Sequence, residues 1–176
     1  MEELKTVEQL CMVDERHELL SQLTGKIFDL SVFHSAISKI DLKSEVPEEI
    51  RSQFNVARNM ALYSYFCYSF APEVQAKTFV LIEHALRLRE ASGRRLMLKK
   101  LLSIAVESGW IKDFRFSHLQ TPDPKNSYSR SLVDLIPSMR NEFAHGTNMV
   151  LPDCIGHLRI CADLINQLYI GGGREK

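Results

Sequence analysis

The sequence contains little glycine, little proline and a single tryptophan, and its charges cancel. Among 176 residues there are 8 Gly, 6 Pro and 1 Trp, and 22 Lys and Arg residues balance 22 Asp and Glu residues. A chain without net charge exerts no long-range attraction on nucleic acid or on an anionic membrane surface, so an anionic partner must be recognised by a local patch. Charged residues interrupt every hydrophobic segment before it reaches the roughly 20 residues that cross a bilayer, which predicts a soluble protein outside the membrane.

Several motifs of catalysis and metal binding are missing as well. The four cysteines are scattered without short metal-ligand pairs, and the first residues do not resemble a signal peptide. We therefore expect free, mostly buried thiols in a cytoplasmic protein. A phosphate-binding glycine loop, a nucleophile elbow and a metalloprotease helix motif are also missing, and the sequence predicts neither a cofactor nor a metal. Cys154, His157 and Cys161 share one face of the last predicted helix, but no fourth ligand is evident, so packing is the favoured interpretation.

The apolar residues recur at helical spacing through most of the chain, which predicts an all-α fold. The clearest helix begins after Pro47, with Glu48 and Glu49 well placed in its first turn. Its apolar and small face consists of Ile50, Phe54, Ala57, Ala61, Ser64 and Tyr68. Further helices are predicted over residues 72–91, with Gly93 as the terminator, and over residues 94–107, 132–146 and 152–170.

The remaining segments define the predicted domain organisation. Residues 110–129 are rich in turn-forming residues and are expected to form a long ordered loop, and Pro137 marks a kink or the true start of the following helix. Residues 1–46 mix helical and β-branched patterns and are assigned as an N-terminal segment packed on the bundle. Residues 47–170 form the bundle and residues 171–176 a flexible tail. Four or five long helices with mostly short links predict an antiparallel helical bundle.

One polar segment lies where a predicted helix ends. At roughly 100° per residue, Met139 and Phe143 point to the core, Arg140 lies at the edge of the apolar stripe, and Asn141 and His145 face outward. Arg140 and His145 are too far apart around the helix to stack as an i, i+4 pair, so they must flank a ligand or meet through a frayed last turn. The carbonyl end of a helix favours a protonated imidazole, which suits His145 to donate and accept protons.

This segment resembles the signature of the HEPN superfamily, the higher-eukaryote and prokaryote nucleotide-binding helical domains. Arg140, Asn141 and His145 match its pattern of arginine, polar residue and histidine, placed before the final helix of a bundle. The resemblance implies a homodimer with two facing motifs and a metal-independent endoribonuclease, with a role in stress or foreign-nucleic-acid defence. Arg140 would bind the scissile phosphate, His145 would move the proton of the ribose 2′-hydroxyl or of the leaving group, and Asn141 would orient them. The product would be a 2′,3′-cyclic phosphate.

Other charged residues around this segment are candidates for supporting roles. Glu83 falls near the inward face of its helix and needs a partner, either Arg87 one turn on or Arg140 across the bundle, where it would hold the catalytic arginine. A locally basic corner could contact RNA phosphates, although a solvated helix face is the more common origin of such a cluster. The candidate RNA-binding residues there are Arg87, Arg94, Arg95 and Lys99.

Two alternatives to the ribonuclease remain open at this stage. The first is a non-catalytic helical dimer that binds RNA, a nucleotide or a regulatory protein partner through the same surface, and the zero net charge favours it slightly. The second is a purely structural dimer, in which Arg140 forms a surface salt bridge and His145 caps a helix.

Overall fold

The structure is a computed structural model that describes residues 3–25, 29–145 and 153–170. Within these ranges the chain forms helices and no strand, which confirms the predicted all-α fold. The long helices are α3 (Glu48–Tyr63), α4 (Phe70–Glu90), α6 (Ser127–Ala144) and α7 (Cys154–Tyr169), and the shorter ones are α1 (Glu15–Thr24), α2 (Leu30–Ser38) and α5 (Leu98–Glu107). Two 3₁₀ turns, η1 (Val7–Gln9) and η2 (Asp113–Arg115), complete the described elements. No helix among them is long and apolar enough to cross a membrane.

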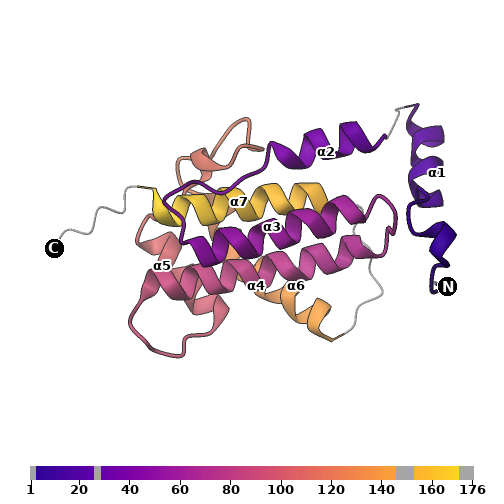
Figure 1. Cartoon of the computed structure of the whole chain (residues 1–176). Coiled ribbons are helices and arrows are strands. Elements are labelled where there is room, and N and C mark those ends of the chain that lie inside the picture. Colours follow the sequence, from indigo (N-terminus) through magenta and orange to yellow (C-terminus); the bar gives the residue numbers. More distant parts are fainter. Residues whose placement is uncertain (1–2, 26–28, 146–152, 171–176) are drawn as a thin grey trace.

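Helix α4 is the centre of the bundle and packs against α3, α5, α6 and α7 (Figure 1). Its neighbours α3 and α6 run antiparallel to it, as predicted. Helix α7 instead runs in the same direction as α4. Two contacts show this: the Cys161 thiol lies 3.8 Å from the Thr78 carbonyl, and further along both helices the Tyr169 hydroxyl lies 3.2 Å from the Ala85 carbonyl. The four long helices alternate in direction along the chain, so the second and the fourth are parallel, and here these two are in direct contact.

The hydrophobic core continues from the long helices into the N-terminal segment. Phe33 and Ile37 of α2 and Val46 of the following link belong to the same buried cluster as Phe54 and Leu158. The β-branched run before residue 40 therefore includes a helix, because α2 buries one face on α3 and has Asp29 as its N-cap, whose carboxylate accepts a 2.8 Å hydrogen bond from the Val32 N–H. Helix α1 lies across the end of the bundle (Figure 1), and the ring of its buried His17 contacts Phe33 and Tyr65 of this core.

Helix α6, which carries the candidate motif, is fixed at its N-terminus by a residue from the preceding loop. The buried Asp113 carboxylate accepts hydrogen bonds from the backbone N–H groups of Tyr128 at 3.1 Å and Ser129 at 2.7 Å, and from the Ser129 hydroxyl at 2.5 Å. A carboxylate at this position satisfies amide groups that the first turn of a helix leaves without partners. The predicted loop thus ends at Asn126, and Pro137 lies inside the helix rather than at its start.

The boundaries of α4 and α5 differ from the prediction. Helix α4 ends at Glu90, and its C-cap Ala91 adopts the left-handed conformation (φ 53°) two residues before the expected terminator Gly93, which is left-handed as well (φ 72°). Helix α5 begins at Leu98 instead of residue 94, because Ser92 offers the chain local alternatives to helical hydrogen bonds. Its hydroxyl donates to Glu90 at 2.6 Å and accepts from the Arg94 backbone N–H at 3.3 Å.

Candidate functional site

The candidate motif occupies the last turn of α6. Arg140, Asn141 and His145 are all exposed, and Arg140 retains 45% of its side-chain surface. Helix α6 ends at Ala144, and the His145 backbone N–H donates to the carbonyls of Asn141 at 3.0 Å and Glu142 at 3.2 Å, which closes the final turn. The expected end at Gly146 lies outside the described residues. The polar side chains of this turn are thus free to meet a ligand or a second molecule.

The apolar side of the same turn anchors it to the bundle. Met139 and Phe143 are half-buried and pack against the core, in agreement with the predicted inward face. The Phe143 ring lies 5.8 Å from that of Phe79 on α4. The ring of His157 from α7 also makes an edge contact with Phe79, with the ring centroids 6.2 Å apart. Because Phe143 and its polar neighbours share one turn, the position of Phe79 sets where Arg140 and His145 emerge.

Glu83 of α4 contacts both of the arginines considered as its partner. Its carboxylate pairs with Arg87 at 2.5 Å and, through the other oxygen, with Arg140 at 3.8 Å. Asn141 adds a long contact, with its side-chain oxygen 3.5 Å from the Arg140 guanidinium. The two alternatives therefore coexist, with Arg87 held tightly and Arg140 loosely. A guanidinium held at the limit of ion-pair distance is oriented, and yet it can still form a bidentate contact with a phosphate.

The basic corner predicted for RNA contact is largely neutralised by carboxylates. Besides the Arg87 pair, Arg94 lies 3.3 Å from Glu90, and Lys99 lies 2.5 Å from Asp134. Arg95 is exposed in the segment before α5. The structure thus brings Arg87 next to the motif through Glu83, whereas Arg94, Arg95 and Lys99 belong to the segment and helix that follow the other end of α4. Exposed pairs of this kind are weak, so an incoming phosphate can compete for the cations.

The two cysteines of α7 are buried in the bundle, and His157 of the same helix is half-buried. Burial raises the pKa of the Cys154 thiol and, more strongly, that of Cys161, whose side chain is fully buried. Burial also lowers the pKa of His157, against an opposing effect of the Asp153 charge. No group of three or more His, Cys, Asp and Glu residues able to hold a metal ion occurs in the described ranges. His157 is a further residue near the motif that the sequence pattern did not indicate, because its ring and that of Phe143 both contact Phe79, and this depends on how α4, α6 and α7 pack.

No family model, curated protein or solved structure matches this chain.

Proposed function

We propose that this protein is a metal-independent endoribonuclease of the HEPN type that acts as a homodimer. The observation that carries the proposal is the arrangement at the C-terminal end of α6, where Arg140 and the C-cap residue His145 are both exposed. Arg140 is also oriented there by the Glu83 carboxylate at 3.8 Å. This supplies a cation and an imidazole, the two groups that cleavage by an adjacent ribose hydroxyl requires.

In the proposed reaction the ribose 2′-oxygen attacks the adjacent phosphorus, and the bond from phosphorus to the 5′-oxygen breaks. His145 of one copy accepts the 2′-hydroxyl proton, and the imidazole of the facing motif gives a proton to the departing 5′-oxygen. Arg140 stabilises the negative charge on the phosphoryl oxygens, and Asn141 orients it. The products are a 2′,3′-cyclic phosphate and a 5′-hydroxyl, so protons and charge balance without any other reactant.

The test is cleavage of end-labelled RNA by the purified chain in excess chelator. We expect His145→Ala to slow cleavage by roughly 10² to 10⁴-fold, the usual contribution of a general acid or base, and Arg140→Ala to weaken both RNA binding and turnover. Arg130→Ala is the matched control, because Arg130 is an exposed arginine near the opposite end of the same helix. His118→Ala is the corresponding control for an exposed histidine in the loop before α6. Both controls should keep the wild-type rate.

The substrate offers a second control. RNA with a single 2′-deoxy nucleotide at a cleavage site should be resistant at that site, because the attacking hydroxyl is missing. Product ends should carry the cyclic phosphate. Cleavage that persists in His145→Ala, or that stops in chelator and returns with added metal, would contradict the proposed chemistry.

A non-catalytic recognition module is the second candidate, and one observation favours it. Arg87, Arg94 and Lys99 each have a carboxylate within 3.3 Å, so the surface lacks the unbalanced positive charge that a nonspecific nuclease uses to hold RNA. Wild-type protein that binds RNA without cutting it, and substitutions at Arg140 and His145 that change binding only, would favour this module over the enzyme.

A further inference from the structure

Helix α1 is attached to the bundle through its polar residues. The Asp14 carboxylate accepts hydrogen bonds from the backbone N–H groups of Arg16 at 3.1 Å and Tyr68 at 2.9 Å. The buried His17 places its Nε2 3.0 Å from the Ser64 carbonyl, and its ring stacks on Tyr65 with centroids 5.5 Å apart. These contacts fix α1 against the turn that connects α3 to α4.

Most of the large apolar residues of the same segment are exposed, whereas Val13 packs against the core. We call residues 3–24 the N-terminal arm. Its large exposed apolar side chains are Leu4, Val7, Leu10, Met12, Leu19 and Leu23, with exposed fractions between 54% and 99%. A surface helix normally buries its apolar side and exposes its polar side, so the arm is inverted. At about 100 Å² of apolar surface for each such side chain, the arm exposes roughly 400 Å², which is the size of a patch that usually serves in binding.

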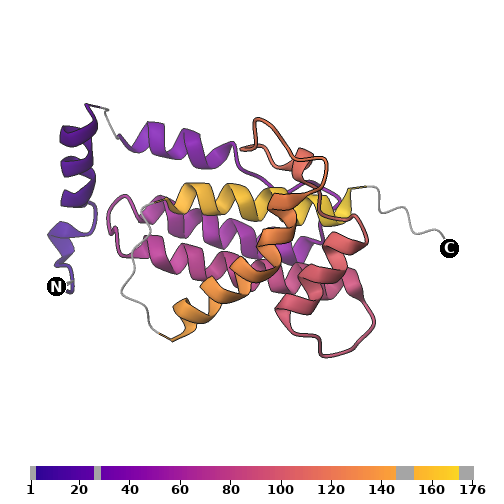
Figure 2. The same ribbon diagram turned by 180° about the vertical axis from the view of Figure 1, so that it is seen from behind.

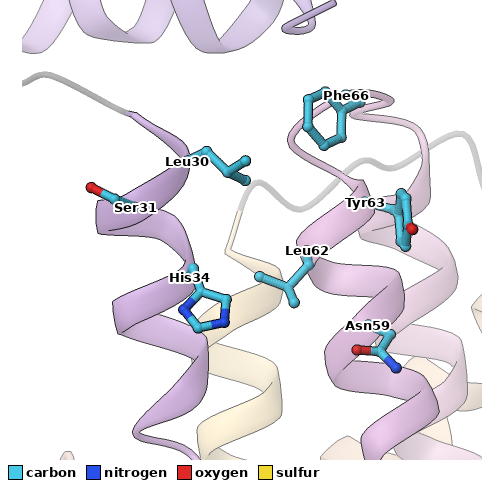
Figure 3. Close-up of a pocket in the computed structure, with 7 residues that line it drawn as sticks. All are labelled: Leu30, Ser31, His34, Asn59, Leu62, Tyr63 and Phe66. Atoms are coloured by element: carbon cyan, nitrogen blue, oxygen red, sulfur yellow. The ribbon is translucent and has the colours of Figure 1, made fainter. Parts of the chain in front are cut away.

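An apolar groove opens beside the arm, between α2 and α3. It has a volume of about 710 Å³, and its apolar walls are Leu30, Leu62, Tyr63 and Phe66. Figure 3 shows Leu30 and Leu62 pointing toward one another across this space, with His34 and Asn59 further along the groove. The leucines of the arm do not line the groove, because the contacts of Asp14 and His17 hold α1 across the end of the bundle.

We propose that the arm of one copy of this chain fills the groove of a second copy, and that the second arm does the same in return. Both complementary surfaces are present on one chain, and a two-fold axis uses each of them twice. Two arms expose roughly 800 Å² of apolar surface, and with the groove area that they cover the total exceeds the roughly 1,000 Å² that a specific interface requires. Each arm stays docked on its own bundle and presents its outward leucines to the partner.

This proposal rests on the homodimer of the proposed function and assigns the contact between the two copies to the arm and the groove. The arm lies at the same end of the bundle as the C-terminal turn of α6 (Figures 1 and 2).

The experiment measures the dimer dissociation constant by sedimentation equilibrium on the full chain without RNA. Wild type should be a dimer at micromolar concentration, and Leu19→Glu/Leu23→Glu should raise the dissociation constant at least about tenfold, or 1.4 kcal/mol. The matched control is Leu88→Glu/Met97→Glu, two exposed apolar residues toward the opposite end of the bundle, which should leave dimerisation unchanged. All four positions are solvent-exposed, and circular dichroism checks that each variant keeps its helical content.

A charge exchange tests whether arm and groove meet. Leu23→Lys alone and Tyr63→Glu alone should each weaken the homodimer, and an equimolar mixture of the two should associate as tightly as wild type. A wild-type chain that stays monomeric at micromolar concentration overturns the proposal, even if the arm captures a different protein. Equal effects of the arm and control variants, or failure of the mixture to associate, overturn it as well. Because no RNA is present, a failed nuclease assay leaves this result unaffected.

Discussion

Replacing Asp113 by alanine should destabilise the protein more than any exposed charge does. The substitution removes three hydrogen bonds to a carboxylate that is 1% exposed, and it leaves two backbone N–H groups in the first turn of α6 and one buried hydroxyl without their partner. A helix cap contributes about 0.5–2 kcal/mol, and hydrogen bonds to charged groups about 1.5–3 kcal/mol each, without adding fully. We therefore expect Asp113→Ala to lower the free energy of unfolding by about 3 kcal/mol. Asp113→Asn, which keeps one acceptor oxygen, should lose about half of that.

Urea unfolding monitored by the fluorescence of Trp110 measures this change. Trp110 is the only tryptophan and lies three residues before Asp113, with the Arg89 guanidinium 5.0 Å from its ring. The control is Asp134→Ala on the same helix, where a 74% exposed carboxylate pairs with Lys99 and should contribute less than about 1 kcal/mol. A loss in Asp113→Ala no larger than that of the control would refute the capping argument. Cleavage per folded molecule should be unchanged, because the motif is at the other end of α6.

Two further predictions concern thiol reactivity and pH. A maleimide should label the exposed Cys11 in the native protein but reach the buried Cys154 and Cys161 only after unfolding. Burial excludes the reagent and raises the pKa of both buried thiols. Equal labelling of the three cysteines in the native protein, measured by mass spectrometry, would contradict the packing. Burial raises the pKa of the Asp14 carboxyl, but the hydrogen bonds from Arg16 and from the Tyr68 backbone outweigh it and hold the pKa well below its usual value. Because the folded pKa is the lower one, the attachment of α1 should be at full strength above about pH 4 and weaken as the pH falls further. Hydrogen exchange in α1 reports this release, and Asp14→Asn should remove its dependence on pH.

The sequence predicted best those helices whose apolar residues recur regularly. Helices α3, α4 and α7 lie within about two residues of their predicted starts, because periodic burial determines them. Ser64 and Tyr68 fall beyond the end of α3, since the chain turns there to enter α4. The start of α5 was predicted too early, because the hydrogen bonds of Ser92 leave no trace in the apolar periodicity. Helix α2 was left ambiguous, because its start depends on the side-chain cap of Asp29 and not on composition.

The polar geometry of the candidate site was predictable only in part. Helical periodicity indicated correctly that Phe143 faces inward and that Asn141 and His145 face outward. It could not decide between two partners for Glu83, because one partner is local and the other depends on how α4 and α6 pack. The inverted arm was not predictable at all, since Leu19 and Leu23 are typical of a helix that buries them, and only the docking of His17 turns them outward.

Pro137 separates an N-terminal unit of α6 from a C-terminal unit that carries the motif. A proline has no backbone N–H, so the carbonyl of Val133 lacks its usual helical donor, and a proline ring inside a helix favours a bend of the helix axis. The first unit is fastened by Asp113, and the second by Phe143 and by the long ion pair of Arg140. Mutations that strengthen or weaken the first unit can therefore accumulate without redirecting the polar side chains of the second. Stability and the orientation of the motif can thus be selected separately within a single helix.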